Sequence, residues 1–342
     1  MKFQFLSFKF QVCTLYFVLC TSYLFSQDIH FSQYYCSPLV INPAKTGNFD
    51  GDYRFTGIHR NQWKSVTVPY KTFAGSFDMR INEFEESKGF FSAGVLFDND
   101  KAGDSDFGLT EGALSFAYSF YLDENKRQMI TAAIQPAFAQ KSINYSNLTF
   151  DNQYNGDIFN AASPTGENFD KSSITYFDIN TGINYLYRNE DKFAVSAGVG
   201  IQHLNKPEQN FFSDKVTLFP RIAADFNLGI KVADRLFVLP TVLYQSQGKF
   251  NELNGGANLK LELSKSEKNA MALYVGGFYR SKDAAIARIG FDYNNLHLGF
   301  AYDFNTSDLD VASNGKGGYE MALVYIFKKV KPLKLNPPCP VY

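Results

Sequence analysis

The stretch of residues 317–327 near the end of the chain constrains the fold more than any other part. Successive side chains of a β-strand point to opposite faces, so a strand can be apolar on one face alone. One face carries Tyr319, Met321, Leu323, Tyr325 and Phe327, and the other carries Glu320, Ala322, Val324 and Ile326. An apolar face with aromatic residues at both ends is typical of a strand that crosses a membrane. The stretch therefore predicts the last strand of a β-barrel, which closes the barrel by pairing with the first.

The chain upstream reads as a meander of similar strands. The predicted strands lie near 52–60, 69–80, 88–98, 107–122, 128–143, 172–188, 192–202, 216–231, 235–246, 250–264, 269–280, 284–293, 295–304 and 317–328. Many exceed the ~5–6 residues of ordinary strands, which favours tilted strands that cross a bilayer over a soluble sandwich or propeller. The sequence thus predicts an all-β fold, an outer-membrane antiparallel transmembrane barrel of about fourteen strands, with little helix.

The connections between these strands alternate in length. Tight turns are expected at 123–126, 189–191, 233–234, 264–268 and 294–295, and longer loops at 98–106, 144–171, 203–215 and 305–316. Outer-membrane barrels place tight turns in the periplasm and long loops outside the cell. An even strand count then predicts that both termini are periplasmic. The rule has exceptions here, because 247–249 and 281–283 are short connections on the expected outer side.

The two ends of the chain flank the barrel. Lys2 and Lys9 precede an apolar run, which predicts a signal peptide over 1–26 with cleavage near Ser26. The alternative is a lipoprotein signal that uses Cys20, although the bulky Leu19 disfavours it. Residues 27–50 form an apolar, proline-containing N-terminal periplasmic or plug segment, residues 51–328 the barrel, and residues 329–342 a periplasmic C-terminal tail.

Composition excludes several function classes. The formal net charge is −1, with no basic stripe, so nothing points to nucleic acid. The four histidines, His30, His59, His203 and His297, form no ligand pair, and no catalytic constellation stands out. We therefore expect no enzyme, no catalytic, metal or cofactor-binding residue, and no cofactor. Cys36 and Cys339 remain after removal of the signal peptide, either as two unrelated thiols or as a disulfide that joins the two ends.

Several segments in order carry a resemblance to a known family. They are QDIHFSQYYCSPLVINPAKTG (27–47), HRNQW (59–63), FDNDKAG (97–103), INYSNLTFDNQYN (143–155), GIQHLNKPEQNFF (200–212), YRSKDAAIARIGFDYNNLHLGFAYDFNTSDL (279–309), NGKGGYEMALVYIF (314–327) and the terminal CPVY (339–342). Together they resemble the PorP/SprF family of Bacteroidota, membrane proteins of the type IX secretion system. Cys36 departs from the family, where a small residue such as Ala is more usual, and Val341-Tyr342 departs where a basic residue and Phe are commoner.

The resemblance implies a non-enzymatic outer-membrane component. Some family members act with periplasmic secretion-machine subunits, and others help to export one partner adhesin or to hold it at the cell surface, in some cases for gliding motility. The implied partners are outer-membrane lipid, a secreted adhesin or other type IX cargo, and periplasmic type IX subunits, with no nucleic acid. The alternative is an outer-membrane porin or transporter for small solutes, with residues 27–50 as its plug.

Two sets of residues are candidates for partner binding. The periplasmic set is Gln33, Tyr34, Tyr35, Pro38, Asn42, Pro43, Cys339, Pro340 and Tyr342. The extracellular set is Asn61, Gln62, Trp63, Phe150, Tyr154, Phe211 and Phe212, where Arg60 to Trp63 are expected to cap the first hairpin. For the N-terminal residues, the alternative is filling of the barrel mouth. Trp63 is either an interface anchor or an adhesin contact.

Overall fold

The computed structural model describes residues 28–64, 68–81, 88–168, 171–189, 192–211, 216–266, 269–308 and 310–328. Its first seven strands are β1 (Tyr53–Gln62), β2 (Tyr70–Ile81), β3 (Gly89–Ala102), β4 (Phe107–Tyr121), β5 (Gln128–Ser142), β6 (Ser173–Asn189) and β7 (Phe193–Gln202). The other seven are β8 (Arg221–Ala233), β9 (Leu236–Gln247), β10 (Phe250–Ser266), β11 (Asn269–Arg280), β12 (Ala284–Tyr293), β13 (Leu296–Asn305) and β14 (Lys316–Phe327).

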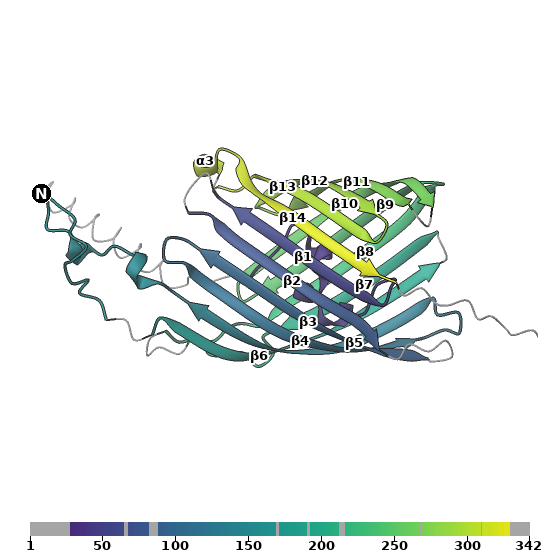
Figure 1. Cartoon of the computed structure of the whole chain (residues 1–342), viewed down its shortest axis with the longest axis horizontal. Helices are drawn as coiled ribbons and strands as arrows, with labels where there is room; N and C mark the ends of the chain where they lie inside the picture. The colour runs from purple at the N-terminus through teal and green to yellow at the C-terminus, as the bar shows by residue number, and fades with distance from the viewer. Residues whose placement is uncertain are drawn as a thin grey trace, which may run out of the picture.

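These strands form one closed antiparallel barrel of fourteen strands (Figure 1). Each strand pairs with its neighbours in sequence, and β14 pairs with β1 along the register that sets Tyr53 opposite Phe327 and Gln62 opposite Gly318. The predicted fold, the strand count and closure by residues 317–327 are confirmed. On β14, Met321 and Leu323 are exposed on the outer face, whereas Glu320 and Ala322 are buried toward the lumen.

The two ends of the barrel differ in their connections. At the turn end, where β1 begins and β14 finishes, the connections are 82–88, 122–127, 190–192, 234–235, 267–268 and 294–295. At the loop end they are 63–69, 103–106, 143–172, 203–220, 248–249, 281–283 and 306–315. The loop end also carries the short helices η4 (Tyr145–Asn147), η5 (Asp151–Gln153) and α3 (Asp310–Ser313). In Figure 1 the 143–172 connection extends well beyond the wall.

Two predicted strand limits are wrong. β3 continues to Ala102, four residues past the predicted 98, because Asp98 to Ala102 pair fully with β4. β8 begins at Arg221 rather than 216. Pro220 has no N–H to donate to a ladder, and Thr217 instead bridges back to Glu208 within the loop. The 203–220 connection is therefore longer than expected, and the 103–106 connection is shorter.

Residues 28–50, called the arm below, lie inside the barrel (purple in Figure 1). The arm contains η2 (Tyr34–Cys36), α2 (Pro38–Ile41) and η3 (Pro43–Lys45). Pro38 and Pro43 occupy the first position of their helical turns, where a missing N–H costs no hydrogen bond. These short turns compact the chain, and the arm needs no strand partner.

The arm runs the length of the lumen from the loop end to the turn end. Asp28 contacts Gln247, the last residue of β9, and Arg221, the first residue of β8, which lie at the loop end. Asp50 contacts Lys328, directly after β14, at the turn end. Within the described residues the chain thus begins and finishes at opposite ends of the barrel. Residues 1–27 and 329–342 lie outside the described residues, so the expectation that both termini are periplasmic stays a prediction.

Candidate functional site

The arm packs against the inner wall through a continuous apolar contact. Phe31, Cys36 and Val40 of the arm are buried with six wall residues, which are Ile58, Ala74, Leu96, Ala113, Ala137 and Ala322. Most of these wall residues are alanines, so the wall leaves room for the larger arm side chains. Removal of this apolar surface from water stabilises the docked arm at about 25 cal/mol per Å².

A buried cluster of charges, called the Ser32 clamp, holds the loop-end half of the arm. It comprises Ser32 of the arm with Arg60 of β1, Arg280 of β11, Asp303 of β13 and Glu320 of β14. The Ser32 Oγ donates to Asp303 Oδ1 at 2.8 Å and accepts from Arg280 Nη1 at 2.8 Å. The Ser32 N–H donates to Glu320 Oε1 at 2.6 Å.

Inside the clamp, both guanidinium groups share one carboxylate. Arg280 Nη2 and Arg60 Nη2 lie 2.6 Å and 3.0 Å from Asp303 Oδ2. Arg60 also donates from Nη1 to the carbonyl oxygen of His30 at 2.6 Å. The clamp therefore balances two cations with two anions and joins four wall strands to the arm, and Arg280 also pairs with Asp283 just after β11. A buried charge is strongly destabilising unless it is paired and hydrogen-bonded, and the clamp provides both kinds of contact.

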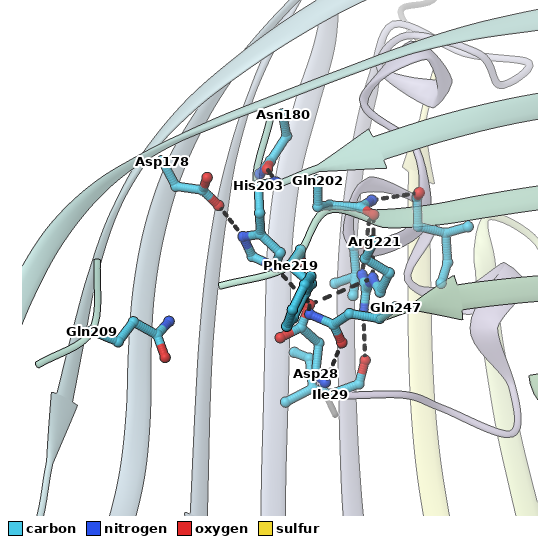
Figure 2. Close-up of polar contacts among 12 residues, drawn as sticks. Asp28, Ile29, Asp178, Asn180, Gln202, His203, Gln209, Phe219, Arg221 and Gln247 are labelled. Atoms are coloured by element: carbon cyan, nitrogen blue, oxygen red, sulfur yellow. Dashed lines mark hydrogen bonds and ion pairs between the residues drawn. The ribbon is translucent and has the colours of Figure 1, made fainter. Parts of the chain in front are cut away.

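A second polar cluster, called the Asp28 latch, holds the first described residue at the loop end (Figure 2). The Asp28 carboxylate lies 2.6 Å from His203 Nε2 and accepts from Gln247 Nε2 at 2.9 Å. His203 Nδ1 is bonded to Asp178 Oδ2 at 2.6 Å. His203 has a positive φ of 57° directly after β7, a conformation that turns its ring toward the lumen.

Arg221 continues the latch along the arm backbone. It donates from Nη1 to the carbonyl of Ile29 at 2.9 Å and from Nη2 to the carbonyl of Val40 at 2.8 Å. Gln202, which lies beside Arg221 in Figure 2, adds a bond from Nε2 to the carbonyl of Ile41 at 2.7 Å. Buried arm carbonyls are therefore satisfied by wall side chains, which replace the partners that a helix or sheet would supply.

The latch residues have shifted pKa values. Burial alone would lower the pKa of His203, but the charge of Asp28 and the hydrogen bonds of Asp178 and Asp28 outweigh burial and raise the pKa to about 9. Burial would raise the pKa of Asp28, but the charge and hydrogen bond of His203 and the charge of Arg221 lower it well below its usual range. The latch is therefore an ion pair at neutral pH.

We expect the latch to lose strength in alkaline solution. The raised pKa of His203 contributes stability that is complete below about pH 6.5 and is lost as the pH rises through about 9. Asp28 acts in the opposite direction, since its contribution is lost only in acid, below its unfolded pKa. The free energy of unfolding of the wild-type protein should exceed that of His203→Gln at about pH 6, and this difference should shrink by about 1–3 kcal/mol by about pH 9.5. Urea unfolding in detergent micelles measures this difference, and equal pH dependence of both proteins would contradict it.

Midway along the lumen the arm contacts all sides of the wall. The Tyr34 hydroxyl shares a hydrogen bond of 2.5 Å with Thr241 of β9, and Gln33 N–H donates to Glu320 of β14 at 2.9 Å. Asn42 Nδ2 donates to the carbonyl of Ile183 in β6 at 3.0 Å. The Thr46 hydroxyl shares a bond of 2.7 Å with Ser115 of β4. The arm thus bridges opposite walls and does not lie along only one of them.

Glycines in β6 and β7 make room for this crossing. A Cβ on Gly200 would lie 2.3 Å from the carbonyl oxygen of Ile41, and one on Gly182 would lie 2.0 Å from Asn42 Oδ1. Any side chain at either position would therefore push the arm away. Gly198, also in β7, has the same role, since a Cβ there would lie 2.6 Å from Asn42 Nδ2.

Ion pairs hold the arm at the turn end as well. Lys45 Nζ lies 2.6 Å from Asp225 of β8. Asp78 of β2 accepts from Arg54 at 2.7 Å and from the N–H of Gly47 at 2.7 Å. Arg80 donates to the carbonyls of Gly47 and Phe49. The arm is therefore fixed at its start, middle and end.

Beside the arm, two neighbouring cavities remain in the turn-end half of the lumen. One of about 460 Å³ is lined by residues that include Tyr35, Cys36, Arg288 and His297. The other, of about 280 Å³, is lined by residues that include Tyr35, Lys45 and Arg188. Both end against the arm at Tyr35, so the arm separates this space from the loop end.

The predicted periplasmic contact residues lie in the lumen as far as they are described. Gln33, Tyr34, Pro38, Asn42 and Pro43 are buried against the wall or within the arm, and the Tyr35 ring packs on Tyr34 and Phe278. The remaining three, Cys339, Pro340 and Tyr342, lie outside the described residues, as does the partner of any bridge to Cys36. In this arrangement the described arm residues contact the barrel itself.

The predicted extracellular residues lie at the loop end but do not form one patch. Asn61 and Gln62 finish β1, and Trp63 follows with a positive φ of 56° and its ring edge-on to Tyr70. Phe150 and the exposed Tyr154 belong to the 143–172 connection, whereas Phe211 packs on Phe107. Phe212 lies outside the described residues. Arg60, expected to cap the first hairpin, instead points into the lumen and joins the Ser32 clamp.

Sequence reasoning missed the wall residues that hold the arm, above all Arg221, Arg280, Asp303 and Glu320. Their signal was present, because each is a charged residue on the small, polar face of an alternating strand. A water-filled lumen has the same pattern, so the pattern alone did not identify the arm as their partner.

In the described part of the chain, no group of three His, Cys, Asp or Glu side chains could hold a metal ion. No helix there is long and apolar enough to cross a membrane.

Similar solved structures include three proteins of low sequence identity. The Ralstonia pickettii toluene transporter TbuX shares 10% identity, with 85% of this chain and 93% of that chain covered and a TM-score of 0.48. The CymD monoaromatic hydrocarbon channel shares 9%, with 86% and 93% covered and a TM-score of 0.48. A Pseudomonas aeruginosa FadL homologue shares 10%, with 84% and 93% covered and a TM-score of 0.46.

A search of curated proteins finds no match to this chain. Among protein families, the model described as "Type IX secretion system membrane protein PorP/SprF" matches residues 24–325. This match spans the arm and nearly the whole barrel, which agrees with the resemblance of the motifs between residues 27 and 327. The chain therefore belongs to the PorP/SprF family, and its closed barrel is an outer-membrane component of the type IX secretion system.

Proposed function

We propose that this barrel is a non-enzymatic anchor that helps to export a partner adhesin or to hold it at the cell surface, and that it contacts periplasmic subunits of the secretion machine. The observation that carries the proposal is the filled lumen. The arm bridges opposite walls at Thr241, Ile183 and Ser115, so the centre of the barrel is structural. The working surfaces of such a barrel are then its two ends.

The loop end offers the surface that best suits a secreted partner. The 143–172 connection projects from the wall (Figure 1), and Tyr154, Ile158 and Phe159 on it are 52%, 68% and 44% exposed. Tyr154 and Phe159 are joined by an isolated β-bridge, so these side chains are held on an ordered turn. Exposed apolar residues on an ordered loop are typical of a protein contact. In this proposal the loop end faces outward and the turn end faces the periplasm.

Loss of the barrel is expected to remove its cargo from the cell surface. A deletion strain should show one large surface protein depleted by about tenfold or more among proteins released by protease shaving, while its total amount in the cell is kept. A Tyr154→Ala, Ile158→Ala, Phe159→Ala triple variant should restore the barrel but not the cargo, because it removes the exposed apolar contact. Mass spectrometry of shaved peptides and of whole cells measures both quantities.

The matched control carries Asp151→Ala and Asp157→Ala, which change the same connection without removing its apolar side chains. This control should display the cargo at the wild-type level. Normal display in the deletion strain would refute the proposed role. Normal display with the triple variant alone would refute only the assignment of the contact to this connection.

A second candidate function is binding or transport of a small solute. The cavity of about 460 Å³ in the turn-end half of the lumen favours it, since it is large enough for such a ligand. The arm disfavours passage of a solute through the barrel, because the cavity ends against Tyr35 and Cys36 of the arm. The conductance experiment described in the Discussion separates the two functions.

A further inference from the structure

A pocket of about 250 Å³ lies on the outer face of the barrel, at the loop end of the seam between β1 and β14. It is called the seam pocket, and its lining includes Asn61, Lys64, Tyr302, Lys316, Gly317 and Tyr319. Asn61 and Tyr319 are cross-strand partners on the same face as the exposed Phe55 and Met321, so they point away from the lumen. Lys316 pairs with the exposed Phe304 beside a bulge, which directs it outward too.

The seam pocket is positively charged. Lys64 and Lys316 are exposed, and no described carboxylate lines the pocket or pairs with either of them. Lys71 of β2 is the partner of Asn61 on the other side, and Lys101 of β3 is the partner of Lys71. The outward-facing positions of β13, β14, β1, β2 and β3 include no Asp or Glu. Four lysines therefore gather at this margin, and none of them forms an ion pair with a described residue.

The pocket also has the shape and polar groups of a binding site. Gly317 forms the floor of the pocket close against β13, since a Cβ there would lie 2.6 Å from the carbonyl oxygen of Asp303. Asn61 is 92% buried by its neighbours, yet its Oδ1 has no hydrogen-bond partner among the described atoms. The hydroxyls of Tyr302 and Tyr319 add two donors beside the lysines. Because Oδ1 only accepts, its partner must be a hydrogen-bond donor such as a sugar hydroxyl, whereas the lysines and tyrosine hydroxyls supply the donors that a phosphate needs.

The wall below the pocket is apolar. Moving from the pocket toward the middle of the barrel, the outward residues are Met321, Phe300 and Leu323, all of which are exposed. The opposite margin of the same strands carries Tyr53, Tyr325 and Phe327 and no outward lysine. A cationic pocket above an apolar wall matches a molecule with an anionic head and apolar chains. On these five strands the outward-facing lysines lie only at the loop end.

We propose that the seam pocket binds the phosphate headgroup of a phosphorylated lipid in the leaflet at the loop end, with the acyl chains of the lipid against Met321 and Phe300. Lysine ammonium groups act as point charges for phosphate, and the tyrosine hydroxyls and the Asn61 side chain complete the site. Basic pockets at a membrane surface recognise lipid headgroups in this way. The proposal depends on the barrel crossing the membrane and is independent of the adhesin contact.

The test is native mass spectrometry of the purified barrel in detergent, with a bisphosphorylated disaccharide lipid as the probe. The wild-type protein should retain this lipid, and Lys64→Ala with Lys316→Ala should bind it about thirtyfold more weakly, since each lysine at a membrane surface contributes about a factor of five. The matched control is Lys171→Ala with Lys192→Ala, which removes two exposed lysines outside the pocket and should bind as the wild type does. Tyr319→Phe should bind several-fold more weakly, because it removes one hydroxyl.

Two further probes distinguish the source of the phosphate. The dephosphorylated form of the same lipid should bind no better to the wild type than to the lysine variant. Inorganic phosphate should fail to displace the lipid at equal concentration. Equal lipid retention by Lys64→Ala, Lys316→Ala and by the control would overturn the proposal. Full displacement by inorganic phosphate would overturn the assignment to a lipid.

Discussion

Deletion of residues 28–49 is expected to convert the barrel into an open pore. The arm crosses the lumen and bridges walls that face each other, at Thr241, Ile183 and Ser115. Without it, the two cavities beside Tyr35 would join the loop end through the space that Phe31, Tyr34 and Leu39 now fill. Barrels with more strands than the smallest ones leave an aqueous channel unless something fills it. Planar-bilayer recordings should show steady steps at least about tenfold larger than any wild-type activity.

A double substitution that keeps the arm provides a second test in case the deletion protein does not fold. Ser32→Ala with Thr46→Ala keeps the arm but removes its hydroxyl contacts to Asp303 and Ser115. It should give brief openings rather than a steady pore, because the apolar contact of the arm remains. Heat-modifiable migration in gels confirms that both proteins are folded. A wild-type barrel that already conducts as well as the deletion protein would refute the closed lumen and would favour the small-solute function.

Asp303→Ala is expected to be the most destabilising single substitution in the lumen. Asp303 is the only carboxylate in the Ser32 clamp that bonds both Arg60 and Arg280, and the structure buries both guanidinium groups to 1% exposure. Its loss leaves only Glu320, 3.5 Å from Arg60, and the partly exposed Asp283, 2.5 Å from Arg280, to balance two buried cations. Breaking a buried ion pair from one side costs about 3–5 kcal/mol, because the remaining charge stays out of water. Urea unfolding in detergent micelles measures the free energy.

Two further variants separate the effect of charge from the effect of side-chain shape in the Ser32 clamp. Asp303→Asn keeps the volume and one acceptor, so it should cost nearly as much if charge dominates and far less if hydrogen bonding does. Glu320→Gln removes the other carboxylate, which bonds the arm backbone at Ser32 and Gln33. It should weaken the docking of the arm while Asp303 still pairs with the arginines. An Asp303→Ala protein as stable as the wild type would contradict the role of the clamp.

The barrel wall was predictable because its determinants are local. The predicted ranges 269–280 and 284–293 coincide with β11 and β12, where apolar and small residues alternate with a period of two and a tight turn separates the strands. The predicted ends of strands were wrong where pairing with another strand decides how far a strand continues. Asp98 to Ala102 look like a loop in sequence, yet β4 offers them partners and β3 continues.

The contacts of the arm were not predictable because they join distant residues. Ser32 and Asp303 are 271 positions apart, and Asp28 and Gln247 are 219 apart. The sequence showed that residues 27–50 are too apolar for a linker, which left filling of the lumen and contact with a subunit as alternatives. Neither alternative specified that the arm would run from the loop end to the turn end. The direction of the arm depends on which charged side chains of the inner wall bond which atoms of the arm. The alternation of residues within one strand carries no information about such pairs.

The arm also imposes an order on assembly. It leads directly into β1, and β1 closes the ring by pairing with β14. The arm contacts β4, β6 and β9 on walls that face each other. We expect these contacts to form as the sheet curls, because they draw the facing walls together, and the β1–β14 pairing to follow them. The N-terminal segment would then act as a template for the barrel, and closure of the seam would be the last step of its biogenesis.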